Sequence, residues 1–162
     1  QLARIALKSA EQVRAFGLPP KVAFLSHSNY GSSRRDSARR VREAFEIFRS
    51  MAPDVECDGE MHGDAAMLEA IRRDNLMESP LHGEANILVC PNIDAANILF
   101  NILKAVTSGA TTMGPMLMGA AAPAHVMTPS TTVRRILAMM ALVAAQAGQK
   151  AGVTRLRERS AG

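Results

Sequence analysis

The sequence predicts an α/β protein, a three-layer α/β/α sandwich with a largely parallel or mixed sheet, and three observations lead to this class. Short continuous apolar runs, which are typical of strands buried on both faces, occur over 22–25 and 85–91. Segments with apolar residues at helical spacing separate these runs. The chain has 162 residues, 48% of them hydrophobic, which is enough for one domain with a sizeable core. Strands that alternate with helices favour a mostly parallel sheet with helices on its faces.

Two helices and two strands are predicted in the first part of the chain. Apolar residues recur at helical spacing over 2–16, and Gly17 with the prolines that follow it ends this helix. The strand over 22–25 leads into a polar loop, after which Asp36 or Ser37 is expected to cap the second helix. Alternation of apolar and polar residues over 55–61 predicts the second strand. The second helix, which Pro53 ends, is expected to bury the stripe Ala38, Val41, Ala44, Phe45 and Phe48.

Two further helices are expected to begin at aspartates in the middle of the chain. Asp64 caps a helix that continues through Ile71, and Asp94 caps the helix that follows the strand over 85–91. The last predicted elements are short strands at Met113–Met118 and His125–Met127 and a helix from Thr131 or Thr132 to about Ala147.

These elements define one predicted domain over 1–148, which is followed by a polar, basic tail over 149–162. The tail is expected to fray or to dock on something outside this segment. Because the chain begins at Gln1 and not at methionine, we expect it to be cut from something longer or to be processed.

The composition favours a reduced, cytoplasmic protein that binds neither nucleic acid nor membrane. The net charge is +4, but aromatic residues make up only 4% and tryptophan is absent, so platforms for stacking bases are poorly supported. The two cysteines have no C-x-x-C spacing, and no secretory leader is recognisable. Glycines and prolines interrupt the first long apolar passage of the final third, and the second, over 136–145, is too short to span a bilayer.

The loop over 26–37 is the strongest candidate for a functional site. It joins a predicted strand to a helix start and carries hydroxyl and amide side chains, one glycine and two arginines. Free backbone N–H groups beside hydroxyls and guanidinium groups can hold an anion such as phosphate. Of the arginines, Arg34 and Arg35 are close enough to the helix start to meet such an anion. The residues over 91–97 and 128–132 also follow predicted strands, so they are expected near the same sheet edge.

Other constellations leave alternatives open. An acid pair could form among Asp58, Glu60 and Asp64. Alternatively, Asp58 and Glu60 lie at a solvated strand end and Asp64 caps a helix. A solvated helix face is the more common explanation for four arginines: Arg34, Arg35, Arg39 and Arg42. Six methionines between Met113 and Met140 fit a core, a subunit contact or a ligand surface.

Known catalytic and metal-binding motifs are missing from the sequence. The four histidines lie far apart and form no H-x-x-x-H or H-E-x-x-H pattern, so no metal ligands are predicted. The chain contains no G-x-S-x-G elbow, no phosphate-binding G-x-x-x-x-G-K-[ST] loop and no G-x-G-x-x-G fingerprint.

Four segments, in order, resemble the phosphate acetyltransferase and phosphate butyryltransferase family. Residues 25–32 are similar to an L-S-x-S-x-x-G-S element, and residues 58–66 to a D-G-E-x-x-x-D-A-A element. Residues 85–91 resemble an A-N-x-L-x-x-P element that ends in Asn97, and residues 109–119 a G-A-x-x-x-G-P-x-L-x-G segment. The resemblance covers most of residues 20–147 and implies the second subdomain of a fold like that of isocitrate and isopropylmalate dehydrogenases.

The resemblance implies a coenzyme A site, because the family moves acyl groups between coenzyme A and phosphate in a cleft between two subdomains. The residues that it places in cofactor binding are Ser26, Ser28, Asn29, Tyr30, Gly31, Ser32, Arg34, Arg35, Asn97, Gly114, Pro115, Thr128 and Ser130.

The catalytic positions of the family are altered in this chain. A Ser-Arg pair after the last strand aligns with Thr128 and Pro129, and an aspartate that opens the final helix aligns with Arg135. Proline supplies neither charge nor N–H, and arginine stays protonated and cannot act as a base. No catalytic residue is therefore predicted.

A degenerate member of this kind resembles the carboxyl-terminal extension of bacterial hybrid NADP-dependent malic enzymes. The resemblance implies regulation by acetyl-CoA, a homodimer or larger homo-oligomer, and NADP and a divalent metal only in a part before Gln1. An active phosphate acyltransferase and a purely structural oligomerisation module are the alternatives.

Overall fold

The computed structural model describes residues 1–75, 78–107, 113–127, 129 and 131–160, with the backbone alone for residue 75 and for 149–160. It contains two compact units, Gln1–Asn101 and Ile102–Gly162. The elements are α1 (Leu2–Ala15), β1 (Lys21–Leu25), α2 (Asp36–Met51), β2 (Glu56–Met61), α3 (Gly63–Met67), α4 (Glu69–Asn75), β3 (Ile87–Val89), α5 (Ile93–Val106) and α6 (Val133–Ser160).

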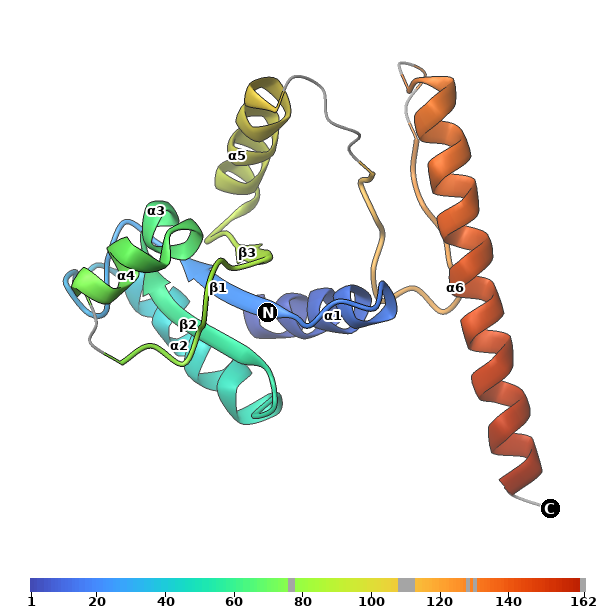
Figure 1. Ribbon diagram of the computed structural model, residues 1–162, viewed down its shortest axis with the longest axis horizontal. Helices are drawn as coiled ribbons and strands as arrows, with labels where there is room; N and C mark the ends of the chain where they lie inside the picture. Colours follow the sequence, from blue (N-terminus) through green and yellow to red (C-terminus); the bar gives the residue numbers. More distant parts are fainter. Residues whose placement is uncertain (76–77, 108–112, 128, 130, 161–162) are drawn as a thin grey trace. The chain divides into compact units, whose positions relative to one another are not determined.

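The first unit contains a three-stranded parallel sheet in the order β2-β1-β3 (Figure 1). The central strand β1 places Val22 opposite Cys57 of β2 and Ile87 of β3. The predicted α/β class with a parallel sheet is therefore confirmed. Because the strands are parallel, the segments that follow β1 and β3 leave the sheet at the same edge.

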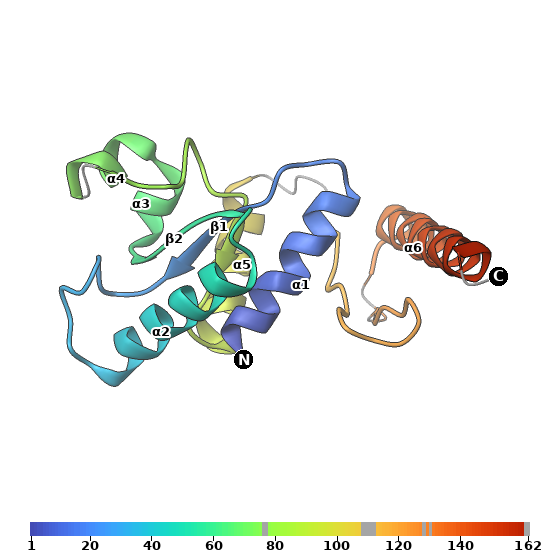
Figure 2. The same ribbon diagram turned by 90° about the horizontal axis from the view of Figure 1, so that it is seen from below.

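Helices cover both faces of this sheet (Figure 2). On one face, α1 and α2 enclose a core in which Phe24 packs against Phe45 and Phe48, with ring centroids 6.1 and 5.6 Å apart. All five residues of the predicted α2 stripe are buried. On the other face, Ala65 and Ala66 of α3 pack against a second core that contains Ala23 and Leu25.

The residues of α1 that are buried in the first core have smaller side chains than the sequence pattern predicts. Its buried residues are Ala3, Ala6 and Ala10. Ile5 remains 46% exposed and Phe16 42% exposed. Small side chains allow the α1 backbone to come close to α2 and to the strands, so packing decides which apolar positions face inward.

A β-bulge in β2 changes which face its side chains occupy. Phe24 pairs with Gly59 but Leu25 pairs with Met61, so Glu60 is the extra residue. Cys57 lies in the first core, and strict alternation would place Met61 there too. Instead Met61 lies in the second core, since the bulge adds one residue between them.

Several predicted helix boundaries are wrong. Arg35, and neither Asp36 nor Ser37, is the N-cap of α2, and no side chain makes a cap hydrogen bond there. The helix predicted from Asp64 through Ile71 is two short helices, because Leu68 has extended backbone angles. Asn92, and not Asp94, holds the start of α5, where its Oδ1 accepts the Ala95 N–H at 2.9 Å.

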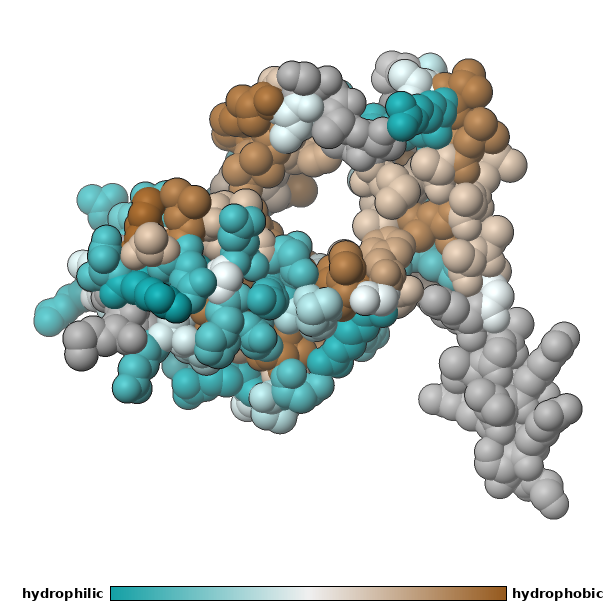
Figure 3. All heavy atoms as spheres, viewed as in Figure 1, coloured by the Kyte–Doolittle hydropathy of each residue, from teal (hydrophilic) through white to brown (hydrophobic). Residues whose placement is uncertain are grey.

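Helix α5 contains no buried residue. Within the first unit, Ile93 is 77% exposed and Ile98 61% exposed. Figure 3 shows these residues' helix as a group of hydrophobic side chains on the surface, in contrast to the polar surface around α2 and α4.

The second unit departs most from the sequence predictions. Neither Met113–Met118 nor His125–Met127 forms a strand, and no strand of the described residues pairs with them. Gly114, with φ +128, and Pro115, which lacks an N–H, do not favour a regular ladder. The segment is held instead by His125, whose Nδ1 accepts the Leu117 N–H at 3.1 Å and whose Nε2 lies 3.0 Å from Gln146 Oε1.

The last helix extends beyond its predicted end near Ala147. Helix α6 continues to Ser160 and therefore through most of the predicted tail. The two interior glycines, Gly148 and Gly152, cost about 1 kcal/mol each, which the arginine, leucine, lysine and glutamate residues around them can offset because these residues favour helix. Within the part of the chain that the structure describes, no helix is long and apolar enough to cross a membrane.

Candidate functional site

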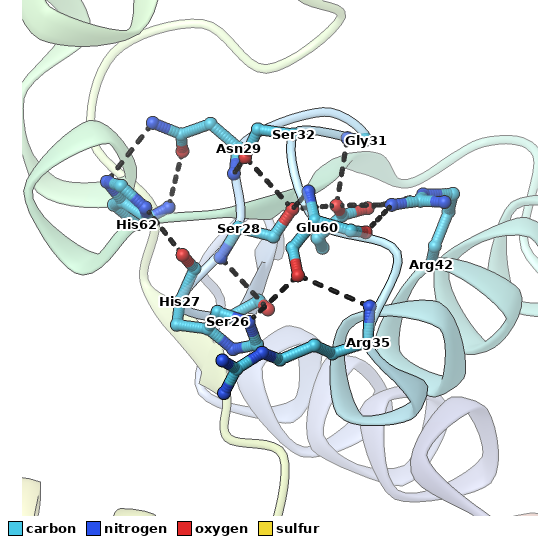
Figure 4. Close-up of polar contacts among 11 residues, drawn as sticks. Ser26, His27, Ser28, Asn29, Gly31, Ser32, Arg35, Arg42, Glu60 and His62 are labelled. Carbon is cyan, nitrogen blue, oxygen red and sulfur yellow. Dashed lines mark hydrogen bonds and ion pairs between the residues drawn. The ribbon is translucent and has the colours of Figure 1, made fainter.

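The loop that follows β1 folds around a carboxylate of the protein itself (Figure 4). Ser28 Oγ donates to Glu60 Oε1 at 2.7 Å, and the Gly31 N–H donates to the same oxygen at 2.9 Å. Arg42 of α2 donates from Nε to Oε2 and from Nη2 to Oε1, both at 2.8 Å. The anion at the centre of the predicted anion site is therefore Glu60.

Glu60 is fully buried but remains ionised because of these donors. Burial alone would raise the pKa of its carboxyl group. The hydrogen bonds from Arg42, Ser28 and Gly31 outweigh burial and lower the pKa of Glu60 to about 2. The same contact raises the pKa of Arg42, so the pair is charged at neutral pH.

The bulge and Gly59 together bring Glu60 to this position. Gly59 has φ +144, a conformation that side chains with a Cβ rarely adopt. A Cβ at Gly59 would lie 2.8 Å from Phe24 Cβ and 2.9 Å from Phe24 O. Only glycine therefore fits between β2 and β1 here, immediately before the carboxylate.

Tyr30 fixes the loop on its other side. Its φ of +47 is unusual for a residue with a side chain. Its backbone N–H donates to the Glu60 carbonyl at 2.8 Å, and its hydroxyl donates to Asp58 Oδ2 at 3.1 Å. Burial first, and then the Asp58 carboxylate, raise the pKa of Tyr30 above its usual value. We call Ser28, Tyr30, Gly31, Arg42, Asp58 and Glu60 the loop floor.

Hydrogen bonds within the loop use most of the remaining donors. The Ser33 N–H donates to Ser28 Oγ at 3.0 Å, and the Asn29 N–H donates to Ser32 Oγ at 3.0 Å. The Ser28 N–H donates to Ser26 Oγ at 3.2 Å, and the Arg35 N–H to Ser33 Oγ at 3.3 Å. These N–H groups are therefore not free for a ligand, which corrects the prediction of an open backbone site.

His62, at the start of α3, holds the loop at its outer end. The His62 N–H donates to Asn29 Oδ1 at 2.7 Å, which orients the amide so that Asn29 Nδ2 faces His62 Nδ1 at 3.2 Å. Since the His27 carbonyl can only accept, His62 Nε2 is the donor in their 3.0 Å contact. The geometry therefore fits a neutral His62 with its proton on Nε2.

Three exposed residues form what we call the loop rim: Ser32, Arg34 and Arg35. Among the described residues, the side chains of Arg34 and Arg35 make no ion pair, whereas Arg39 pairs with Asp36 and Glu43. The two rim arginines are thus the cations of this loop that an external anion can reach.

The structure brings together the predicted site residues between Ser26 and Arg35 but not the others. Asn97 is exposed on α5, where Asn101 Nδ2 donates to its Oδ1 at 2.9 Å. Gly114 and Pro115 belong to the second unit. Thr128 and Ser130 lie outside the described residues.

Sequence reasoning placed Asp58, Glu60 and Arg42 wrongly. A solvated strand end was one prediction for Asp58 and Glu60, and both are buried. The acid-pair alternative is not what the contacts show either, because each carboxylate has its own donors. The glycine between them, at a position where β2 approaches β1, was the available signal. Among the described side chains, no group of three metal-binding types is close enough to hold a metal ion.

The fold, a parallel sheet with helices on both faces, is that of phosphotransacetylases. A model of the phosphate acetyl/butaryl transferase family matches residues 1–144, and the chain belongs to this family. A phosphotransacetylase from Streptococcus pyogenes superposes with a TM-score of 0.85 at 32% identity, over 91% of this chain and 45% of that one. EutD phosphotransacetylase from Staphylococcus aureus gives a TM-score of 0.81 at 31% identity, with the same coverage.

Among relatives compared by sequence, this chain is similar to part of an NADP-dependent malic enzyme. The enzyme from Salmonella typhimurium is 55% identical over 147 residues, which are 91% of this chain and 19% of the relative. The phosphate acetyltransferase of Paracoccus denitrificans is 41% identical over 90% of this chain and 46% of its own length. The chain thus spans about a fifth of the malic enzyme that it matches.

Proposed function

We propose that this chain is a phosphate-acetyltransferase-like regulatory domain of an NADP-dependent malic enzyme, which senses acetyl-CoA and has no acyltransferase activity of its own. One observation carries the proposal: identity is 55% to a malic enzyme and 41% to a phosphate acetyltransferase. Malate oxidation would then belong to a part outside this segment, together with the NADP and divalent metal that it needs.

The loop rim supports binding of acetyl-CoA. Coenzyme A carries several phosphates, and guanidinium groups bind phosphate through charge-assisted hydrogen bonds. Arg34 and Arg35 are exposed and make no ion pair among the described residues. Since the donors of the loop floor already bind Glu60, the rim would supply the contacts to acetyl-CoA. The floor would hold the loop in its conformation.

Two substitutions support the absence of acyl transfer. Pro129, at the position of the family's arginine, offers neither charge nor N–H to a developing negative charge. Arg135, at the position of the family's aspartate, lies in the first turn of α6. It remains protonated and cannot remove the proton of the coenzyme A thiol.

Calorimetry tests the sensing function. In the full-length protein that the comparison implies, acetyl-CoA should release or absorb heat on binding, and malate oxidation should change when acetyl-CoA is added. The Arg34→Ala/Arg35→Ala variant should weaken both responses, whereas Arg14→Ala, an exposed arginine that pairs with Asp54, should not. Absence of binding by full-length protein would reject this function.

The second candidate, an active phosphate acyltransferase, is favoured by the phosphotransacetylase fold. It predicts that the full-length protein cleaves acetyl-CoA only when phosphate is present. Release of free thiol, followed with a thiol reagent, decides between the two functions. Phosphate-dependent release would overturn our proposal of a silent domain.

Assembly into a homodimer or larger homo-oligomer is the remaining part of the proposal. The apolar surface of α5 supports it, because Ile93 and Ile98 are large, apolar and exposed. Sedimentation at micromolar concentration should give a dimer or larger species. An Ile98→Asp variant should shift the protein toward monomer if α5 is at the contact, and a monomeric parent protein would exclude the assembly.

A further inference from the structure

Arg72, on the short helix α4, is the largest fully buried side chain of the described residues, yet its guanidinium faces no carboxylate within salt-bridge distance. Nη1 donates to the Ala65 carbonyl at 2.8 Å. Nη2 donates to the Leu81 carbonyl at 2.8 Å and to the Gly83 carbonyl at 2.6 Å. The cation thus clamps α3 to the segment 81–83.

Burial of the Arg72 guanidinium costs free energy. A buried charge that lacks an opposite charge must be compensated by hydrogen bonds. The three carbonyls accept from three of the five N–H groups of Arg72. Arg72 Nε is buried without a hydrogen-bond partner in the described structure. An apolar residue would avoid this cost but would donate no hydrogen bond. A lysine ammonium is more strongly hydrated, and its donors lie on one atom, so it cannot reach the separate carbonyls that Nη1 and Nη2 of Arg72 reach.

The clamped segment is connected to the loop floor. The Leu81 N–H donates to Ser79 Oγ at 3.2 Å, and Ser79 Oγ in turn donates to Asp58 Oδ2. The same Asp58 oxygen accepts the Tyr30 hydroxyl at 3.1 Å. Asp58 is buried, so its orientation depends on these two hydroxyl donors and on the Gly59 N–H that donates to its other oxygen.

We propose that Arg72 is a positioning residue for the loop over 26–35: it fixes the segment 79–83, which orients Asp58 through Ser79, and Asp58 holds Tyr30. Arg72 does not touch the loop rim. Its effect on acetyl-CoA binding rests on the function proposed above, but its effect on Tyr30 does not.

Tyr30 is the only tyrosine of the chain, and tryptophan is absent, so ultraviolet absorbance of tyrosinate reports this one hydroxyl. Burial and the Asp58 carboxylate raise the pKa of Tyr30, and the Arg72 charge lowers it. If Arg72 acted on Tyr30 only as a neighbouring charge, its removal would therefore raise the pKa of Tyr30. If Arg72 instead supports Asp58, its removal would lower the pKa of Tyr30, because Tyr30 would lose both the charge and the hydrogen bond of the Asp58 carboxylate.

The test compares Arg72→Met, Arg72→Lys and Ser79→Ala with the unchanged chain at about pH 11, one unit above the usual tyrosine pKa of about 10. We expect severalfold more tyrosinate in all three variants than in the unchanged chain. Arg14→Met is the control, because Arg14 is an exposed arginine of α1 that pairs with Asp54. It should leave the tyrosinate fraction unchanged.

Circular dichroism of the same samples shows whether each variant is folded. A folded Arg72→Met chain with the same or less tyrosinate than the unchanged chain would overturn the proposal. If Arg72→Met does not fold, Ser79→Ala decides, since it removes one hydroxyl and leaves Arg72 in place; an unchanged fraction there would also overturn it. Because these measurements contain no acetyl-CoA, they stand even if the acetyl-CoA function fails.

Discussion

The loop floor and the loop rim are neighbours in sequence but differ in what their charges do. In the floor, Glu60 and Arg42 are paired, and Glu60 is fully buried. In the rim, Arg34 and Arg35 are exposed and make no ion pair among the described residues. The difference shows that a run of serines, glycine and arginines can serve two tasks, one of which is to bind an internal anion. Substitutions should therefore separate stability from ligand response.

The largest effect is expected at Gly59. A Gly59→Ala chain must accommodate a Cβ 2.8 Å from Phe24 Cβ in a conformation, φ +144, that disfavours it. We expect a loss of about 4 kcal/mol in the free energy of unfolding, from overpacking together with backbone strain. Urea denaturation measures it. Gly63→Ala is the control, because nothing lies within 4 Å of a Cβ there, and an equal loss in both variants would contradict the close approach.

The next effect concerns the partner of Glu60. Arg42→Met removes both donors from Arg42 and leaves a buried carboxylate with Ser28 and Gly31 alone. We expect a loss of about 3 kcal/mol, since a buried charge without its partner is strongly destabilising. Arg39→Met, which removes an exposed arginine from the same helix, should change the free energy of unfolding by less than about 0.5 kcal/mol. Similar losses in the two variants would mean that Arg42 contributes no more to stability than an exposed arginine of the same helix.

The pH dependence of stability should reveal Glu60 itself. Its pKa is about 2 in the folded chain and near 4.5 ordinarily. Because the folded pKa is the lower one, the stabilisation is complete above about pH 4.5 and is lost as the pH falls toward about 2. Glu60→Gln should be about 2 kcal/mol less stable at neutral pH. It should lose less stability than the unchanged chain across this window; parallel curves would contradict an ionised Glu60.

The smallest effect on stability is expected at the rim. Arg34→Ala/Arg35→Ala should change the free energy of unfolding by less than about 0.5 kcal/mol, since both side chains are exposed. The same variant should lose most of any response to acetyl-CoA in the full-length protein. Loss of stability together with response would show that rim and floor are not separate.

The sheet and the first two helices could be predicted from the sequence because burial leaves a local pattern. The continuous apolar run of β1 and the five-residue stripe of α2 are both buried as expected. The strands predicted at Met113–Met118 and His125–Met127 could not be judged in this way. A strand needs a neighbour, and an apolar segment does not say whether a partner strand is beside it.

The position of the loop over 26–35 was predictable from the sequence, but its internal contacts were not. The strand-loop-helix pattern indicated where the loop lies, and the family resemblance indicated its relatives. The pairing of Ser28 with Glu60 and of Glu60 with Arg42 joins residues that are far apart in the chain. Long-range contacts of this kind leave no spacing rule in a single sequence, and the bulge that directs Glu60 is invisible to a pattern of alternation.

The bulge has one consequence for insertions and deletions. Side chains of a strand alternate between faces, so removal of one residue transfers everything after it to the opposite side. Because Glu60 is the extra residue of the bulge, its deletion would instead remove the carboxylate and the bulge together, and Met61, which already pairs with Leu25, would keep its place in the second core. A substitution at this position changes a charge, whereas a deletion would also make β2 a regular strand without exchanging its two cores.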